Sequence, residues 1–398
     1  MLTVSSAVKE LIAQAQPLVD DRRRAGLESV PVPEALGRVP ATDIVSEIDV
    51  PPAANSAMDG YAFCAADATA HKYKLAISQR IPAGTAPEPL QPGTAARIFT
   101  GGEIPAGADT VAMQENCTET EGWVKVDKKA VAGDNVRDRG QDIKHGAVII
   151  KAGTRLRAQE LGLLSSVGIA KVELFKPLKV AIFSTGDELV EPGMPLQPGQ
   201  IYNSNRATLI GLIESLGMVP VDLGVVPDRL AATQHVLKKA AMRGDVIISA
   251  GGVSVGEEDY VKTAVEKLGA VEFWKVAIKP GKPLAFGHVE NIPFIGLPGN
   301  PASVFATFMI LARPFLLACQ GCPAGSPKRL KSRAQFSKPG EKREVYLRGR
   351  LTESGAEIYP NQSSGVLSSA CWGDVFVVQT SGQSIEVGDL VDVLPYSL

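Results

Sequence analysis

The segment from residue 178 to 322 alternates short apolar runs with amphipathic stretches, and this alternation constrains the fold more than any other feature. The apolar runs include KVAIFST, VDLGVV, DVIISA and IPFIG, and the longest stretches between them are NRATLIGLIESLG and LAATQHVLKKAAMRG. Strands that alternate with helices of about 12 residues form βαβ crossovers. We therefore predict a mostly parallel sheet with helices on both faces. The turn HVEN, between PLAFG and IPFIG, predicts a hairpin and one antiparallel strand.

The rest of the chain divides into three parts by its pattern. Residues 1–45 and 143–177 carry helical periodicity, as in the run from Ser5 to Arg23, in EALGRVPATDI and in TRLRAQELGLLSSVGI, which predicts one helical domain built from two pieces. Residues 46–142 hold short apolar runs between PAG, PGT and AGAD turns, which predicts an inserted β domain. Residues 328–398 contain EVYLRGRL, DVFVVQT and DLVDVLP, which predicts a C-terminal β-barrel. With an α/β domain at 178–327, we expect four domains.

Charge and cysteine content exclude several classes of protein. The chain has 41 Lys and Arg residues against 43 Asp and Glu residues, so its net charge of −2 does not favour a nucleic-acid partner. Five cysteines among 398 residues are too few for a disulfide scaffold, and they fit a reducing cytoplasm. With four histidines, none paired at helical spacing, any metal should be hard and bound by oxygen.

Membrane insertion and targeting are not expected. The most apolar segment, from Val304 to Ala312, stops at Arg313 and Pro314, well short of the roughly 20 residues that span a bilayer. The N-terminal residues read as an amphipathic helix rather than a secretory signal.

Glycine-rich or acidic loops follow four of the predicted strands. Because ligands in open α/β sheets bind beyond the carboxyl ends of the strands, we expect these loops to share one rim. Glycines free the backbone to present N–H groups to a phosphate, and Asn300 with Pro301 opens the next helix. The candidate phosphate-binding residues are Gly251, Gly252, Ser254, Gly256, Pro298, Gly299, Asn300 and Pro301.

Charged residues of both signs lie on or near this rim. The acids are Glu188, Asp228 and Asp259, and the lysines are Lys275, Lys279 and Lys282. Carboxylates hold Mg²⁺ and lysines neutralise phosphate oxygens, so the set suits metal-assisted phosphate chemistry. Structural roles remain open: the two aspartates could cap or open helices, and the lysines could form a solvated face.

The cysteines carry no visible chemistry. Cys319 and Cys322 form a lone CxxC pair at a helix end without a second pair, and Cys371 has no visible base. We expect packing roles for all three.

Seven sequence blocks together resemble the signature blocks of a known family. They are NSAMDGYA at 55–62, FTGGEIPAGAD at 99–109, RDRGQDI at 137–143, FSTGDEL at 183–189, SAGGVSVGEEDY at 249–260, KVAIKPGKP at 275–283 and GLPGNPAS at 296–303. In order and content they resemble the signature blocks of the MoeA family, the molybdopterin molybdenumtransferases, to which the gephyrin E domain also belongs. Several ordered blocks are far more specific than GGVSVG alone.

The resemblance implies an activity and an assembly. The activity is insertion of molybdate into adenylylated molybdopterin with Mg²⁺-dependent release of AMP. The assembly is an elongated homodimer of four-domain subunits, in which the insert of one subunit faces the molybdopterin-binding α/β domain of the other. A molybdopterin adenylyltransferase and apo-molybdoenzymes are candidate partners.

The resemblance also assigns residues. Family functional positions correspond to Asp59, Thr100, Asp142, Glu188, Asp228, Asp259, Lys275 and Lys279, with Glu188, Asp228 and Asp259 expected at the metal. By similarity to plant members, a molybdate pocket would use Lys279, Lys282, Ser303, Arg348 and Ser369. Gly373 and Asp374 stand where the family often has Ala-Asn, shortly after Ser369.

Two other functions stay open. The α/β domain also resembles molybdopterin adenylyltransferases, which attach AMP rather than remove it, although the insert and the barrel argue against that activity. A dimeric scaffold like gephyrin is the second alternative, although no long linker or second catalytic domain accompanies these four domains.

Overall fold

The computed structural model describes residues 1–253, 260–281, 283–323 and 328–397, and its central element is a six-stranded sheet. The strands, in spatial order, are β16 (Val219–Val226), β13 (Lys179–Thr185), β17 (Val246–Ala250), β21 (Ile292–Leu297), β20 (Pro283–Val289) and β18 (Gly269–Lys275). The first four are parallel, and β20 runs antiparallel to both of its neighbours. The predicted hairpin and single antiparallel strand are confirmed, with Glu290 and Asn291 at positive φ in the turn.

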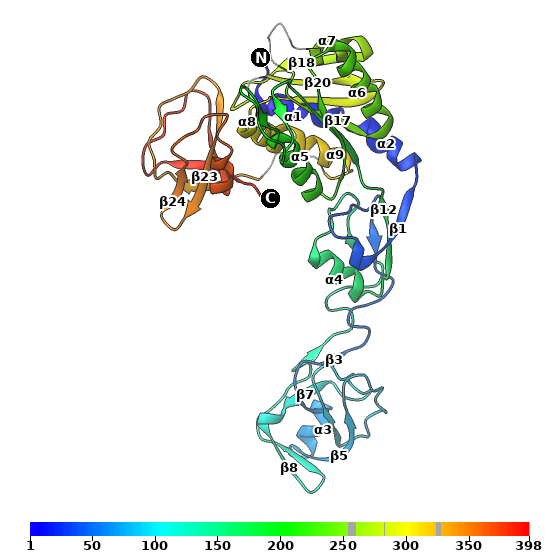
Figure 1. The fold of residues 1–398 in the computed structure, drawn as a ribbon. Coiled ribbons are helices and arrows are strands. Elements are labelled where there is room, and N and C mark those ends of the chain that lie inside the picture. The colour runs from blue at the N-terminus through cyan, green and yellow to red at the C-terminus, as the bar shows by residue number, and fades with distance from the viewer. Residues whose placement is uncertain (254–259, 282, 324–327, 398) are drawn as a thin grey trace.

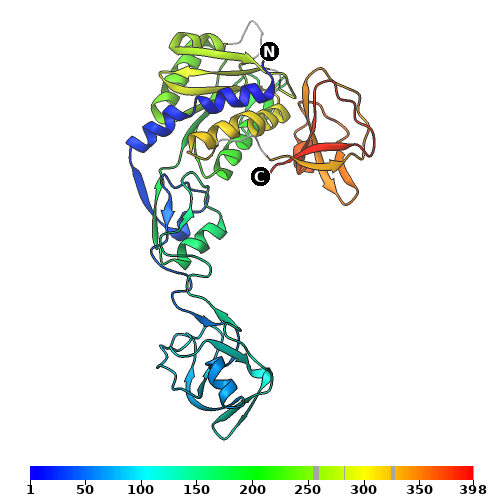
Figure 2. The same cartoon turned by 180° about the vertical axis from the view of Figure 1, so that it is seen from behind.

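Helices cover both faces of this sheet because both faces are apolar. In β13, Val180 and Ile182 face one core and Ala181 and Phe183 face the other, as side chains alternate along a strand. The second core is closed by α6 (Leu230–Arg243) and α7 (Tyr260–Leu268), and the first by α5 (Ser204–Ser215), α8 (Pro301–Thr307) and α9 (Arg313–Cys319). Figures 1 and 2 show these layers from two sides.

The helix after β21 continues through a proline. A π-helical segment, η3 (Phe308–Ala312), joins α8 to α9, so the helix continues past Pro314 to Cys319. Proline lacks an N–H and its ring collides with the carbonyl four residues earlier in an α-helix, and the wider π turn lies just before this proline. Within the described ranges, Pro301–Cys319 is the one helix long and apolar enough to span a membrane, and 83% of its apolar window is buried in the protein.

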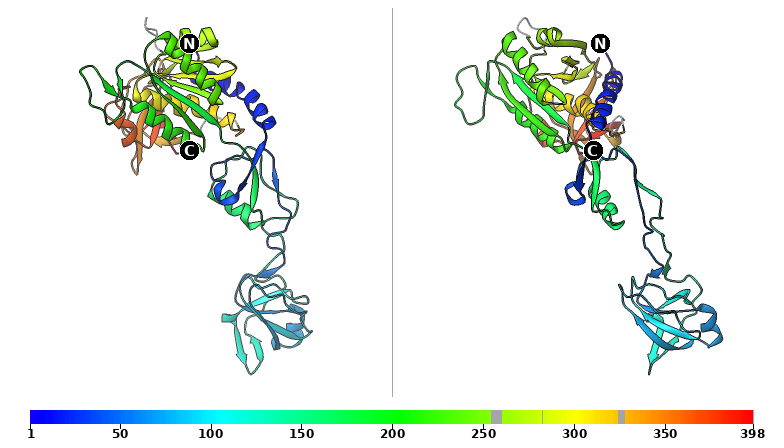
Figure 3. Two further views of the ribbon diagram at one scale, coloured as in Figure 1. Left: turned by 45° about the vertical axis from the view of Figure 1, so that its right-hand side comes forward. Right: turned by 90° about the vertical axis from the view of Figure 1, so that its right-hand side faces the viewer.

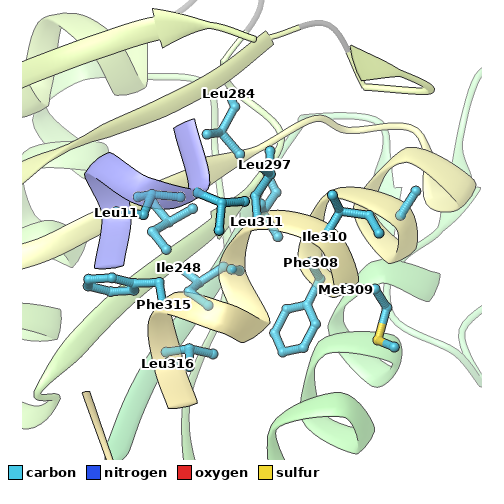
Figure 4. Packing of buried hydrophobic residues seen from close by; sticks show 14 of the residues in the cluster. Leu11, Ile248, Leu284, Leu297, Phe308, Met309, Ile310, Leu311, Phe315 and Leu316 are labelled. Carbon is cyan, nitrogen blue, oxygen red and sulfur yellow. The ribbon is translucent and has the colours of Figure 1, made fainter. Parts of the chain in front are cut away.

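The N-terminal helices do not join a helical domain with residues 143–177, which corrects that prediction. Helices α1 (Val4–Ala13) and α2 (Gln16–Arg24) pack on α9 instead. Leu11 lies in the same buried cluster as Phe315 and Leu311, as Figure 4 shows. The physical reason is that the apolar stripe of α1 needs an apolar partner, and the first face of the α/β sheet supplies the largest one.

A small mixed unit takes the place of the predicted helical domain. It pairs β1 (Leu27–Pro31) with β12 (Lys171–Phe175) and β2 (Ile44–Val45) with β11 (Val148–Ile150), and adds α4 (Ala158–Ser166) and the short η1 (Val32–Glu34). The segment EALGRVPATDI, predicted as helical, holds only the end of η1 and the start of β2. Val30, Leu156, Leu164 and Leu174 form the unit's own core.

The insert is a second six-stranded sheet with a separate core. Its spatial order is β7 (Thr110–Met113), β4 (Gly60–Phe63), β6 (Thr94–Ile98), β5 (Lys74–Ile81), β9 (Trp123–Val126) and β8 (Cys117–Thr120). Two short helices, α3 (Ala65–Ala70) and η2 (Gln114–Asn116), and the pair β3 (Asn55–Ser56) with β10 (Val136–Arg137) complete it. Two chain segments join the insert to the small unit, and a bridge between Val50 and Ile143 ties them together.

The C-terminal region is a sheet that takes one strand from the α/β region. The strands are β19 (Ile278–Lys279), β22 (Leu330–Arg333), β23 (Glu344–Thr352), β24 (Gly355–Ile358), β25 (Val375–Gln379) and β26 (Leu390–Pro395), with the short helix α10 (Ser368–Trp372). Pairing runs β23–β25–β26–β22, and a bridge from Ala334 to Ala356 leads on to β24, which pairs with β23 again. The strand β19 extends this sheet through Lys279 opposite Val345.

The molecule is elongated, with the insert at one end and the α/β region with the C-terminal sheet at the other (Figures 1 and 3). A flap made of β14 (Leu189–Val190) and β15 (Ile201–Tyr202) projects from the α/β region near the carboxyl ends of its strands. The candidate site residues are therefore distributed over two distant ends of the chain.

Candidate functional site

A cavity of about 790 Å³ lies at the carboxyl ends of the parallel strands. Loops after β13, β16, β17 and β21 meet there, as the sequence predicts for this rim, and the C-terminal region closes one side. The lining residues with polar side chains are Thr185, Glu188, Tyr202, Asn203, Ser204, Asn205, Asp228, Lys279, Asn300, Ser303, Arg343, Gln362, Ser363 and Ser364. The candidates Gly251, Gly252, Pro298, Gly299 and Pro301 also line it.

The glycine loop after β17 is possible only with glycine. Gly252 has a φ of +64°, and a Cβ built on it would lie 2.3 Å from a methyl carbon of Val261. Gly251 has a φ of +92°, and its Cβ would lie 2.8 Å from the carbonyl oxygen of Thr185. The loop therefore packs its backbone against β13 and α7.

Two carboxylates reach the cavity from neighbouring loops. Glu188 is exposed and lines the cavity beside Asp228. The backbone N–H of Asp228 donates to Asp187 Oδ1 at 3.1 Å, and that of Asp187 donates to Asp228 Oδ2 at 3.3 Å. These reciprocal bonds tie the loop after β13 to the loop after β16.

Three buried polar atoms at the cavity have no hydrogen-bond partner within the part of the chain that the structure describes. They are Thr185 Oγ1, Asn203 Nδ2 and Asn205 Oδ1, on side chains exposed by 7% or less. Buried polar groups are normally hydrogen-bonded, since an unmade bond costs about 1–3 kcal/mol. These atoms are therefore suited to contact a polar ligand.

The loop after β21 joins the α/β region to the C-terminal region. Asn205 donates from Nδ2 to the carbonyl of Gly299 at 2.7 Å, and Asn300 donates from Nδ2 to Ser364 Oγ at 3.1 Å. The backbone N–H of Ala302 donates to the carbonyl of Ser364 at 3.0 Å. The C-terminal region is thus bonded to the rim that carries the candidate phosphate-binding loop.

A second cavity of about 290 Å³ adjoins the first and is basic. Lys279, Pro280, Gln362 and Ser363 line both cavities, and Lys338 and Arg348 line the second. Arg348 is only 1% exposed, and burial lowers the pKa of its guanidinium. A buried cation beside a cavity is suited to an anion, because an anion offsets part of its desolvation cost.

The predicted molybdate residues are divided between these cavities and their surroundings. Ser303 lines the large cavity, whereas Ser369 lines neither of them. Ser369 accepts from Arg348 Nε at 2.9 Å, so it orients the guanidinium. Asp374 accepts from the backbone N–H of Leu351 at 3.0 Å and lines neither cavity.

The insert carries a separate hydrogen-bonded pair. Asp59 Oδ1 accepts from the backbone N–H of Thr100 at 2.7 Å and from its hydroxyl at 2.8 Å. These bonds, the backbone bond first, hold the pKa of Asp59 below its ordinary value. Asp142 is exposed where the insert's two connecting segments meet, and its N–H donates to the carbonyl of Val50 at 2.9 Å. None of these three residues lines either cavity of this chain.

Some predicted residues are not brought to the cavities or cannot be placed. Lys275 is exposed at the end of β18 and lines neither cavity. Ser254, Gly256, Asp259 and Lys282 lie outside the described residues. Among the residues that are described, no group of three or more His, Cys, Asp or Glu side chains is arranged to hold a metal.

Sequence reasoning missed several contributions, among them Gln362, Ser363 and Ser364 and two further segments. One is Asn203–Asn205, at the start of α5, and the other is the turn KPGEKRE, which supplies Lys338 and Arg343. The first has a sequence signal, because Asn203 caps the helix and accepts from the N–H of Arg206 at 3.2 Å. The second has only a cluster of basic residues, which a solvated turn would also show.

Cys319 and Cys322 match the packing role expected of them, whereas Cys371, which was also expected to pack, is exposed. All five are free thiols, and burial raises the pKa of Cys322 to about 11 and that of Cys319 further. Thiols of this kind are poor nucleophiles.

Comparisons with known proteins agree along the whole chain. Residues 2–168 match the MoeA N-terminal region (domain I and II), residues 181–318 a probable molybdopterin binding domain, and residues 329–396 the MoeA C-terminal region (domain IV). A molybdopterin molybdenumtransferase of Haemophilus influenzae is 38% identical over 403 residues, covering 95% of this chain and 98% of the relative. One from Nostoc is 39% identical over 328 residues, covering 80% and 75%.

A solved structure shows the same arrangement of the chain. The MoeA protein of Pyrococcus horikoshii aligns over 100% of both chains with a TM-score of 0.84 and 29% identity. A second structure from that organism has a TM-score of 0.78 and 33% identity, and covers 99% of each chain. The resemblance of the seven sequence blocks is thus confirmed, and the chain belongs to the MoeA family.

Proposed function

We propose that this protein is a molybdopterin molybdenumtransferase that inserts molybdate into adenylylated molybdopterin and releases AMP. The observation that carries the proposal is the pair of adjoining cavities that share Lys279. The large one combines acids, glycine loops and unpaired buried polar atoms, which suits a polar pterin phosphate. The small one is basic and suits a compact oxyanion.

The acids of the large cavity fit Mg²⁺. Glu188 and Asp228 offer oxygen ligands from adjacent loops, and Mg²⁺ is commonly held by one or two carboxylates together with waters and substrate phosphates. A bound Mg²⁺ would neutralise charge on the phosphates. Asp259, the third predicted ligand, lies outside the described residues and stays a prediction.

The protein's own cations would stabilise the anionic groups. Lys279 stands between the two cavities, so its ammonium could contact either a phosphate or molybdate. Arg343 lines the large cavity and donates to the carbonyl of Ile278 at 2.9 Å, which holds its guanidinium beside Lys279. Phosphoryl chemistry depends mainly on such positioning and charge stabilisation. Lys275 and Lys282 remain candidate phosphate and molybdate ligands.

The active site needs a second subunit in this proposal. Asp59, Thr100 and Asp142 lie at or near the far insert, away from the cavities of their own subunit (Figure 1). In a C₂ dimer each insert would reach the cavity of the other chain, so two equivalent sites form. We place this homodimer in the cytoplasm, where a molybdopterin adenylyltransferase would supply the substrate and apo-molybdoenzymes would receive the product.

The test is AMP release from purified protein mixed with adenylylated molybdopterin, with and without Mg²⁺ and molybdate. We expect release to require both ions, and the product to reconstitute an apo-molybdoenzyme. Tight pterin binding without AMP release would indicate a carrier or a scaffold instead. Formation of adenylylated molybdopterin from ATP would indicate an adenylyltransferase.

Variants then test the acids. Glu188→Gln and Asp228→Asn should each lower AMP release by about 10²-fold, since each removes one charge from the phosphate site. Glu357→Gln is the matched control, because Glu357 is partly exposed, pairs with Arg350 at 2.8 Å and lines neither cavity. Equal activity of all three variants would contradict the carboxylate assignment.

A further inference from the structure

Lys279 is already ion-paired in this structure. Its ammonium lies 2.6 Å from Glu341 Oε1, and the two side chains are 41% and 32% exposed. Lys279 lines both cavities, whereas Glu341 lines neither. The carboxylate therefore touches the shared lysine from outside the space that a ligand would occupy.

Further positive charges surround this carboxylate. Lys279, Lys338 and Arg343 all lower the pKa of Glu341, with the hydrogen bond from Lys279 as the largest cause. These are the same cations that face the cavities: Lys338 lines the small one, Arg343 the large one and Lys279 both. Glu341 is thus an internal anion placed among the groups that would bind an external one.

The chain holds the backbone of Glu341 while leaving its side chain partly exposed. Its carbonyl accepts from the N–H of Gly382 at 2.7 Å, and β23 begins three residues later opposite β19, which carries Lys279. Rotation of the side chain would break the contact with Lys279 without moving either strand. A partly exposed ion pair is weak enough to exchange, since such pairs contribute about 0–1 kcal/mol.

We propose that Glu341 is a positioning residue that keeps Lys279 ion-paired until an oxyanion displaces it, and so sets the oxyanion affinity of the two cavities. The inference rests on the proposed function for the identity of that oxyanion, molybdate. A dianion bound to Lys279 is repelled by a carboxylate on the same ammonium, so Glu341 must turn away for tight binding. Weak anions would then leave the lysine paired, which favours a strongly charged, well-fitting ligand.

The experiment measures binding of sodium molybdate to the full-length chain by calorimetry at fixed ionic strength. Glu341→Gln removes the charge and keeps the shape, so the Kd for molybdate should fall by up to about fivefold. Glu341→Asp keeps the charge and should stay within about twofold of the natural protein. In a Lys279→Ala background, Glu341→Gln should have a smaller effect, because its main contact is gone and only the more distant Lys338 and Arg343 remain.

Each outcome of this binding experiment either supports or overturns the role of Glu341. Glu357→Gln, which removes an ion-paired carboxylate in the same sheet, should leave the Kd unchanged. Unchanged or weaker binding by Glu341→Gln would overturn the inference, as would no measurable binding by any of the proteins. A merely structural role would lower the thermal midpoint without tightening binding.

The same data separate this inference from the proposed function. If the natural protein releases no AMP but Glu341→Gln still binds molybdate more tightly, the proposed activity fails and the role of Glu341 stands. If AMP release depends on molybdate but Glu341→Gln leaves its Kd unchanged, only the role of Glu341 fails.

Discussion

The cavity region and the insert position their candidate site residues in different ways. The cavity draws on loops from Thr185 to Ser364, which crossovers and a second sheet bring together. In the insert, Asp59 precedes β4 and Thr100 follows β6, and the antiparallel pairing of Gly60 with Ile98 sets them side by side. One site therefore depends on long-range packing, whereas the other depends on a single strand pair.

The carboxylates of the two regions also differ in how firmly they are held. Asp59 is held by two hydrogen bonds from Thr100, so its carboxylate has a defined orientation before any ligand arrives. Glu188 is exposed on a loop and accepts no such pair of bonds among the contacts seen within the described chain. The insert thus offers a preorganised carboxylate, and the cavity offers in Glu188 a carboxylate that a ligand can still draw into place.

The largest expected effect comes from inactivating the insert in one subunit and the cavity in the other. Asp59→Asn protein and Lys279→Ala protein should each release almost no AMP. When equal amounts are mixed and allowed to exchange subunits, half of the dimers become mixed and each carries one intact site. AMP release should then recover to about a quarter of the natural rate.

The control for this experiment mixes Lys279→Ala with Glu188→Gln. Both residues line the same cavity, so a mixed dimer has no intact site and should stay inactive. Recovery in this control, or none in the first mixture despite subunit exchange shown by mass, would mean that each subunit holds its own complete site.

A smaller effect should follow from adding one methyl group to the cavity rim. In Gly252→Ala, a residue with a left-handed backbone conformation carries a Cβ that lies 2.3 Å from Val261. This change should lower the free energy of unfolding by about 3 kcal/mol. Hydrogen exchange of the β13 and β17 amides should accelerate, while exchange in the insert should not change.

Gly199→Ala is the matched control for that change. Gly199 has a φ of +87°, but a Cβ there would meet nothing within 4 Å. Gly199→Ala should therefore lower the free energy of unfolding only through backbone strain, by about 1 kcal/mol. If Gly252→Ala and Gly199→Ala proved equally stable, steric crowding at the glycine loop would not determine the shape of the rim.

The smallest effect concerns the pH dependence of the insert. The folded-state pKa of Asp59 lies below its unfolded value, so its hydrogen bonds stabilise the fold above about pH 4 and are lost as the pH falls through the folded pKa. Thr100→Val removes the hydroxyl donor and keeps the backbone donor. Its Asp59 pKa, followed by NMR, should rise toward the ordinary value, and less stability should be lost on acidification.

Thr118→Val is the comparison variant for this titration. Thr118 donates to Asp127 at 2.8 Å in the same insert, and this bond lowers the pKa of Asp127. It should move the pKa of Asp127 and leave that of Asp59 in place. An Asp59 pKa unaffected by Thr100→Val would show that the backbone bond alone is responsible.

Prediction from the sequence was most accurate where local pattern and tertiary environment agree. The strands of the α/β region are apolar on both faces, and a buried parallel sheet is the arrangement that such runs favour. The pattern was misleading at the N-terminus, where amphipathic helices were assigned to the wrong neighbour. The periodicity of a helix shows which of its faces is apolar, but not which surface of the protein packs against that face.

The same limit applies to the site. Gly251, Gly252, Glu188 and Asp228 could be placed on one rim because each follows a strand of one sheet. Lys338, Arg343 and Glu341 could not, because the docking of a separate sheet brings Lys338 and Arg343 to the cavities and Glu341 to Lys279. Lys275 and Lys279 lie four residues apart, yet β19 carries only Lys279 into the C-terminal sheet and to the cavities.

By itself, the sequence determined the α/β class, the hairpin, the glycine loops and the family. These depend on periodicity, on residues that alone tolerate a left-handed backbone and on ordered motifs, all of which are local. Only the tertiary structure decided that α1 packs on the α/β core, that Ser369 orients Arg348, and that Glu341 holds Lys279. Such contacts depend on which surfaces meet, and that is determined by the total burial of the whole chain rather than by any one segment.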